Sequence, residues 1–136
     1  VIVIALGGND FSSYSATYNT LTDAQKLAFQ ATVTDALVAF VTTLRAYHPD
    51  AYIVLVYGLM NEATHVRNVS INAALRLSGE TDKVSSLLVT GAGQSNTGFG
   101  SDGHPTVAAY VIAAGQLADH ISAITGREQV RTDITF

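Results

Sequence analysis

Two short segments of the sequence, residues 1–6 and 52–57, are continuously apolar and rich in β-branched side chains, without the polar alternation of a half-exposed strand. Runs of this kind are typical of strands that are buried on both faces of a parallel sheet. Residues 84–89 predict a third strand. These segments constrain the fold most strongly, because a strand buried on both faces needs a layer of helices on each side of its sheet.

Helical signals separate the predicted strands. Thr22 and Gln25 have the spacing of a capping box, in which each side chain bonds the backbone N–H of the other residue, so we expect a helix to begin at Thr22. This helix should end before Pro49, since a proline disfavours helical geometry in the residue that precedes it. Further helices are expected over residues 61–78 and after Pro105, whereas residues 11–21 are expected to form a polar loop.

The alternation of strands and helices predicts an open α/β fold of three α/β/α layers with a parallel sheet, of the flavodoxin-like kind. The 136 residues fit one domain, with no internal linker or repeat. A strand that is buried on both faces belongs inside a sheet, so its position at residues 1–6 indicates that further strands precede it. We therefore expect residues 1–136 to be the C-terminal portion of a single domain.

The composition excludes several classes of function. Charged residues make up 13% of the chain, about half of the roughly 25% typical of globular domains, and the mean hydropathy is +0.27, which indicates that something else covers part of the surface. A net charge of −4 offers no basic field for nucleic acid. No apolar run approaches the ~18 residues of a membrane span, so none is expected. The absence of cysteine excludes thiol catalysis, cysteine zinc sites and disulfides.

Polar residues follow the first and third predicted strands at their carboxyl ends, where open parallel sheets form their sites. Gly7-Gly8-Asn9-Asp10 follows the first, and a glycine-rich loop over residues 91–103 leads to Asp102-Gly103-His104-Pro105. His104 is the candidate base, since the pKa of imidazole lies near neutrality; the alternative is an exposed histidine at a helix start. Asp102 either orients the imidazole, as the acid of a serine triad does, or is only a turn residue.

Asn9 offers an amide donor, the group that a developing oxyanion requires. The alternative is an asparagine that tolerates a left-handed turn between Gly8 and Asp10. Asp10 is expected to hold the turn. The remaining histidines (His48, His65 and His120) lack metal-ligand spacing, and no nucleotide-binding glycine motif is present, so we expect no metal and no cofactor.

These motifs resemble those of a known superfamily. Gly7-Gly8-Asn9-Asp10 resembles the G-x-N-D block of the SGNH (GDSL-type) hydrolases, and Asp102-Gly103-His104-Pro105 resembles their last block, which bears the catalytic histidine. Residues 6–11, 82–85 and 97–106 look like carbohydrate esterase family 2, whose members deacetylate xylan and other plant polysaccharides. The resemblance covers essentially the whole chain, but only the second half of that family's catalytic domain.

The resemblance implies a carbohydrate O-acetyl esterase of the acetyl xylan esterase type, a carboxylic ester hydrolase with a Ser-His or Ser-His-Asp mechanism. It implies that Asn9 donates to the oxyanion and that His104 activates the serine. Asp102 is then the possible third member, although some family members resemble dyads in which a backbone carbonyl orients the histidine. Much of the superfamily has its acid three residues before the histidine, where this chain has Ser101.

The resemblance also implies a nucleophilic serine in a Gly-Asp-Ser block, which this sequence lacks. Ser12, Ser13, Ser95 and Ser101 do not occur in that context. We therefore expect the nucleophile in the N-terminal part of the same domain, on the same precursor or on another chain. The 136-residue chain alone is expected to be inactive.

The implied substrate is an acetylated saccharide. Gly8, Asp10, Phe11 and Phe99, which lie in or beside the motifs, are the candidate substrate contacts. A polysaccharide substrate implies secretion. Two alternatives remain open: a non-catalytic carbohydrate-binding or interaction subunit with an SGNH-like fold, and a lipase or esterase of the GDSL type.

Overall fold

The computed structural model describes residues 1–13, 15–59, 64–79, 83–89 and 100–129. Three strands, β1 (Ile2–Ile4), β2 (Ile53–Tyr57) and β3 (Val84–Leu88), form one parallel sheet in the order β1-β2-β3. Ile53 of β2 pairs with Ile2 on one side and with Val84 on the other. The three strands and their parallel pairing confirm the prediction from the sequence.

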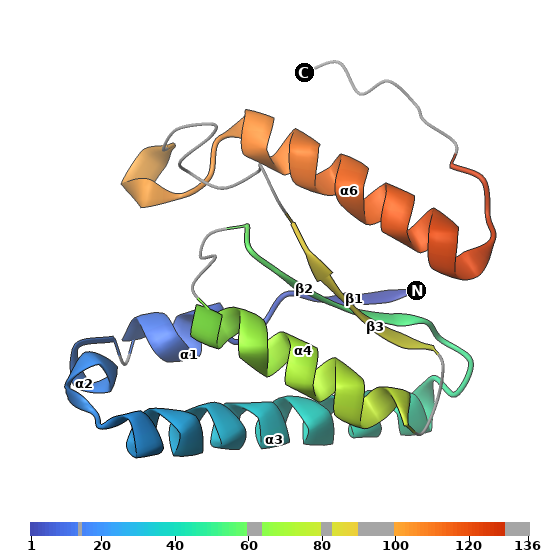
Figure 1. Cartoon of the computed structure of the whole chain (residues 1–136). Coiled ribbons are helices and arrows are strands. Elements are labelled where there is room, and N and C mark those ends of the chain that lie inside the picture. Colours follow the sequence, from blue (N-terminus) through green and yellow to red (C-terminus); the bar gives the residue numbers. More distant parts are fainter. Residues whose placement is uncertain (14, 60–63, 80–82, 90–99, 130–136) are drawn as a thin grey trace.

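The helices lie on both faces of this sheet. They are α1 (Gly8–Ser13), α2 (Ser15–Thr20), α3 (Asp23–Tyr47), α4 (Thr64–Ser78) and α6 (Val107–Thr125), with a short 3-10 turn, η1 (Ser101–Gly103). Figure 1 shows α3 and α4 on one face of the sheet and α6 on the other. The predicted three-layer α/β/α arrangement is thus confirmed.

α3 begins and ends where the sequence predicts. The Oε1 atom of Gln25 accepts from the backbone N–H of Thr22 at 2.9 Å, and the Oγ1 atom of Thr22 accepts from the N–H of Gln25 at 3.3 Å. The helix ends at Tyr47 with His48 as its cap, directly before Pro49. The capping box therefore fixes the first turn of α3, and the proline fixes its end.

The expectation of a loop over residues 11–21 is wrong, because α1 and α2 occupy most of this segment. The reason is burial of two aromatic side chains. Phe11 is 2% exposed and Tyr18 is 5% exposed, and their rings meet edge to face with centroids 5.3 Å apart. Helices this short are marginal in isolation, so contacts with the rest of the fold stabilise them.

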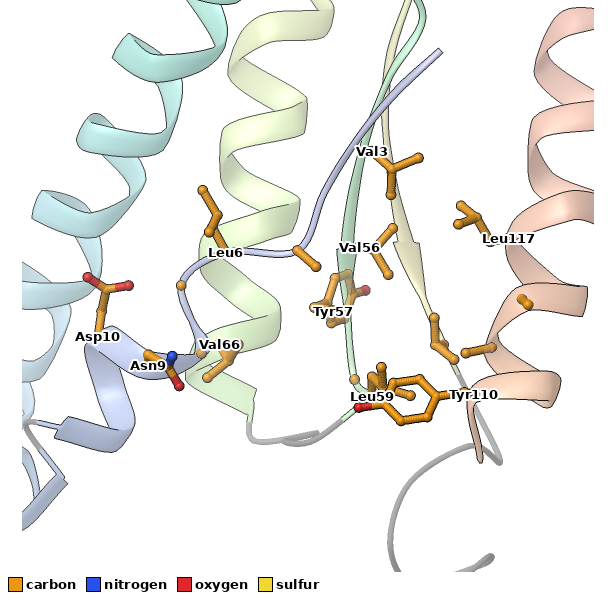
Figure 2. A pocket seen from close by; sticks show the side chains of 17 residues that line it. Val3, Leu6, Asn9, Asp10, Val56, Tyr57, Leu59, Val66, Tyr110 and Leu117 are labelled. Atoms are coloured by element: carbon orange, nitrogen blue, oxygen red, sulfur yellow. The ribbon is translucent and has the colours of Figure 1, made fainter. Parts of the chain in front are cut away.

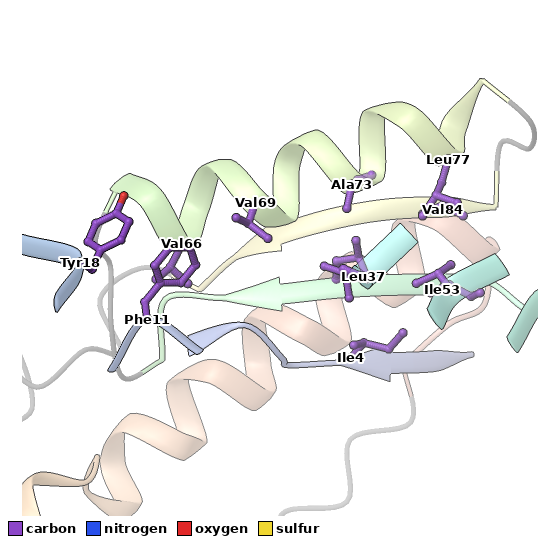
Figure 3. Close-up of a cluster of buried hydrophobic side chains, with 13 residues drawn as sticks. Ile4, Phe11, Tyr18, Leu37, Ile53, Val66, Val69, Ala73, Leu77 and Val84 are labelled. Atoms are coloured by element: carbon purple, nitrogen blue, oxygen red, sulfur yellow. The ribbon is translucent and has the colours of Figure 1, made fainter. Parts of the chain in front are cut away.

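The core lies between the sheet and the α3–α4 layer (Figure 3). β2 is its centre, since Ile53 is completely buried and Leu55 is 1% exposed. α4 presents one apolar face to the sheet, made of Val66, Val69, Ala73 and Leu77, as its sequence pattern predicts.

The α6 layer is much more exposed. Val107, Tyr110 and Val111 are 63%, 48% and 56% exposed. One hydrogen bond between the Oγ atom of Ser85 and the Nε2 atom of His120, at 2.8 Å, joins β3 to α6. The α6 layer therefore leaves apolar side chains exposed.

Two helices, α3 and α6, are long and apolar enough to cross a membrane by length and composition alone. No membrane span was expected from the sequence, and one or two helices of this kind are weak evidence against that expectation. Core helices of globular domains meet the same criteria, and α3 places Leu37 and Val41 in the core beside α4. We assign no membrane-spanning role to either helix.

Candidate active site

Glycines in a left-handed conformation end the first two strands. Gly7 follows β1 with φ of +97°, and Gly58 follows β2 with φ of +102°. A Cβ atom at Gly58 would lie 2.8 Å from the carbonyl oxygen of Val89, so the chain after β3 passes directly over this glycine. Both turns lie at the carboxyl end of the sheet, where α/β folds form their sites.

Asn9 and Asp10 lie in the first turn of α1, directly after Gly7, and both side chains are exposed. Among the residues that the structure describes, Asp102 is the only non-glycine residue with a positive φ. Asn9 therefore does not serve as a left-handed turn residue, which removes the structural alternative considered for it. Its amide remains available at the carboxyl end of β1.

An open cavity of about 620 Å³ lies between the sheet, the start of α1 and α6 (Figure 2). Its walls are mainly apolar, with Val3 and Val56 from the sheet and Leu117 from α6, while Gly8, Asn9 and Asp10 line its α1 side. An amide donor thus borders an apolar cavity at the end of the sheet where chemistry is expected.

The second motif forms a tight turn before α6. The backbone N–H of His104 donates to the carbonyl of Ser101 at 3.0 Å, and the N–H of Gly100 donates to the carbonyl of His104 at 2.7 Å. Asp102 adopts φ of +53°, and its Oδ2 atom accepts from the hydroxyl of Ser101 at 3.4 Å. Both Asp102 and His104 are exposed. The turn therefore holds the backbone of His104 while its imidazole faces outward.

The two motifs lie at the same end of the sheet, α1 beside α4 and η1 beside α6 (Figure 1). They are not joined: His104 is not among the residues that line the cavity, whereas Asn9 is. Within the described part of the chain, no hydrogen bond connects the Asp102 carboxylate to the His104 imidazole. Asp102 thus has the backbone of a turn residue and is not hydrogen-bonded to His104 in this structure, and its role in orienting the imidazole stays a prediction.

The candidate substrate contacts divide into three groups. Gly8 and Asp10 border the cavity, in agreement with a place at the site. Phe99 lies outside the described residues. Phe11 is in the core with 2% of its surface exposed, so its ring is closed to a sugar and the expectation for this residue is wrong. The reason is that Phe11 lies in the helix α1, which turns its ring inward.

His65, for which the sequence indicates no metal-ligand spacing, lies against two aromatic rings in the structure. It lies in the first turn of α4, with its imidazole centroid 4.6 Å from the ring of Phe11 and 4.9 Å from that of Tyr18. Burial lowers the pKa of this imidazole below its ordinary value. Only a signal for the helices α1 and α2 could have placed Phe11 and Tyr18 against it. Among the described residues, no cluster of three or more His, Asp or Glu side chains could hold a metal ion.

Comparison with known proteins gives a match at the level of solved structures. No model of a known protein family matches the sequence, and neither does a curated protein. A family two carbohydrate esterase from Clostridium thermocellum in complex with cellohexaose aligns over 91% of this chain, with 26% sequence identity and a TM-score of 0.72. The chain resembles the family two carbohydrate esterases. An active-site mutant of a family two carbohydrate esterase from the same organism aligns over the same 91%, with 26% identity and a TM-score of 0.70.

The alignment covers 35% of the length of each of those two chains, so this chain spans about a third of them. The resemblance expected from the G-x-N-D and D-G-H-P segments is thereby confirmed. The α/β fold is confirmed by the same match. The positions of Asn9 and His104 in this fold are therefore the starting point for a functional proposal.

Proposed function

We propose that this chain is part of a carbohydrate O-acetyl esterase, with the nucleophilic serine supplied by another part of the same domain. The main support is the position of Asn9, an exposed amide at the carboxyl end of β1 on the wall of the cavity. The structural similarity to family two carbohydrate esterases supplies the substrate class. The proposal includes secretion of the protein, because an acetylated polysaccharide is an extracellular substrate.

In the proposed reaction, the serine oxygen attacks the carbonyl carbon of the acetyl ester while His104 takes the serine proton. The side-chain amide of Asn9 donates to the oxyanion of the tetrahedral intermediate. The intermediate collapses to an acetyl-enzyme as the sugar alcohol leaves with the proton from His104. Water, deprotonated by His104, then attacks the acetyl-enzyme; the acyl C–O bond breaks, acetate is released, and the serine oxygen takes the proton back from His104. The imidazole is oriented either by Asp102 after rearrangement of its turn or by a backbone carbonyl.

The partner of this chain in the proposal is the rest of the same domain. Val3 of β1 is 42% exposed, Leu6 is 55% exposed and Tyr110 of α6 is 48% exposed, and all three line the cavity. An exposed apolar surface of this kind marks a place for another protein surface. The missing part would cover these side chains and bring the serine toward Asn9 and His104.

The test uses the intact gene product that contains this chain, with an aryl acetate and acetylated xylan as substrates. His104→Ala should lower kcat by about 10²–10⁴-fold, the range for loss of a positioned acid-base group. His48→Ala is the matched control, since His48 is an exposed histidine at the end of α3 and should leave kcat unchanged. Full activity of the His104→Ala protein would overturn the assignment of the base.

A second candidate is a non-catalytic saccharide-binding subunit with the same fold. In its favour, no hydrogen bond joins the Asp102 carboxylate to the His104 imidazole in the described part of the chain, whereas the acid of a serine triad orients its imidazole. An intact protein that binds acetylated saccharide without turnover, and whose sequence has no Gly-Asp-Ser block, would establish this candidate. Hydrolysis of long acyl esters in preference to acetate would instead indicate the GDSL lipase alternative.

A further inference from the structure

The place of Asn9 is not fixed by the chain that precedes it. α1 has six residues, and helices shorter than about 12 residues are marginal in isolation. Gly7 and Gly8 come directly before Asn9, and apart from the adjoining chain no atom lies within 4 Å of where a Cβ of either glycine would be. Glycine also restricts its own backbone least. The restraint on Asn9 must therefore come from its other side, where Phe11 is buried.

Phe11 and Asn9 face in opposite directions. Two residues of an α-helix are about 200° apart around the axis, since there are 3.6 residues in a turn. Phe11 accordingly points into the core with 2% exposure, while Asn9 is exposed beside the cavity. Rotation or displacement of Phe11 thus moves Asn9 directly.

Three rings from three other helices enclose Phe11. Tyr18 of α2 and Phe29 of α3 each meet it edge to face, with centroids 5.3 Å away and an interplanar angle of 88°. His65 of α4 lies closer, at 4.6 Å and 47°. These distances are within the range of favourable aromatic pairs. We call Phe11, Tyr18, Phe29 and His65 the Phe11 cluster.

The cluster suits a neutral His65. Burial lowers the pKa of its imidazole, and a cation is also unfavourable in the first turn of a helix, where the dipole is positive. The titratable groups around it are few in the described helices. From α2, the hydroxyl of Tyr18 accepts from Gln30 at 2.9 Å; from α3, the Nζ atom of Lys26 lies 6.0 Å from the Tyr18 ring centroid. Asp10 of α1 is adjacent to Phe11 and exposed.

We propose that His65, together with Tyr18 and Phe29, is a positioning residue that sets the location of the Asn9 amide by clamping the ring of Phe11. The inference rests on the proposed role of Asn9 as oxyanion donor. Such a donor must lie at hydrogen-bond distance from the oxyanion, and a displacement of about 1 Å can cost about 10²-fold in rate. His65 acts on the reaction through Phe11 and α1, and touches no reacting atom.

The kinetic test compares His65→Ala and His65→Phe in the intact protein. His65→Ala opens one wall of the cluster and should lower kcat about tenfold with KM changed less than about twofold, a smaller loss than removal of an oxyanion donor causes. His65→Phe keeps an aromatic wall and should restore kcat to within about twofold of the parent. His48→Ala is again the control. A change confined to KM, or no rescue by His65→Phe, would overturn the inference.

A second measurement needs no activity and so separates this inference from the proposed function. The side-chain amide resonances of Asn9, assigned with the Asn9→Asp variant, are followed by NMR in the isotope-labelled intact protein as the pH is lowered. They should shift with the same midpoint as the His65 ring and stay constant in His65→Phe. If the Asn9 chemical shifts change neither with pH nor in His65→Ala, the positioning role is refuted, even if the protein is an active esterase. If the Asn9 and His65 shifts change with the same midpoint but the intact protein has no esterase activity, only the proposed esterase function is refuted.

Discussion

Gly58 provides a sharp test of the packing at the carboxyl end of the sheet, through the substitution Gly58→Ala. The new Cβ would lie 2.8 Å from the carbonyl oxygen of Val89 and 2.7 Å from the Cδ1 atom of Leu88. The leucine can rotate, but Val89 is held, because its N–H donates to the carbonyl of Tyr57 at 2.9 Å. Overpacking typically costs about 1–3 kcal/mol. A left-handed backbone adds about 1–2 kcal/mol for a residue with a side chain.

The expected loss of unfolding free energy for Gly58→Ala is therefore about 2–5 kcal/mol. Two matched glycines separate the two causes. Gly126, with φ of +67° and no atom within 4 Å of a Cβ, should lose only the backbone part, about 1–2 kcal/mol. Gly115, inside α6 with a negative φ and equally open space, should gain about 0.5–1 kcal/mol as alanine.

The assay is urea unfolding of the three variants and the parent, followed by far-ultraviolet circular dichroism and analysed for the unfolding free energy. The order of stability should be Gly115→Ala, parent, Gly126→Ala, Gly58→Ala. A Gly58→Ala protein no less stable than Gly126→Ala would refute the close approach of the chain after β3. Equal m-values across the series are needed, since they show that the unfolded states are comparable.

Two further predictions concern stability. Thr22→Ala should cost about 1 kcal/mol in the same urea assay through loss of the α3 cap, while Thr32→Ala, inside α3 and exposed, should cost nothing, and equal losses would contradict the capping argument. His65 should make the unfolding free energy fall as the pH is lowered from above its unfolded pKa to its lower folded pKa, because the unfolded state then binds more protons. His65→Phe should flatten this part of the pH dependence, and an unchanged slope would show that another group is responsible.

The sequence predicts the parts of this fold that depend on local signals. Thr22 and Gln25 are three residues apart, Pro49 follows directly after the helix cap, and both effects need no distant partner. The apolar run at β2 likewise predicts a strand covered on both faces, since no polar side chain interrupts it. The end of the sheet where Asn9 lies follows from the parallel topology alone.

The remaining features depend on contacts that the sequence does not display. The segment from Phe11 to Tyr18 contains small polar residues typical of loops, and its helices exist because Phe11 and Tyr18 meet Phe29 and His65 from other parts of the chain. The backbone conformation and hydrogen bonding of Asp102 could not be predicted from the sequence either. Its left-handed backbone and the Ser101 hydrogen bond direct its carboxylate, and spacing along the sequence carries no information on either.

The strands of this sheet lie side by side in the order in which they occur along the chain. Each pairing therefore requires only the strand that was made just before it, and β1 can pair with β2 while β3 is still being synthesised. Translation is slow compared with the docking of a short strand, so N-terminal units generally fold first. The order β1-β2-β3 thus permits stepwise assembly on the ribosome, with each new strand added to the edge that its predecessor has just formed.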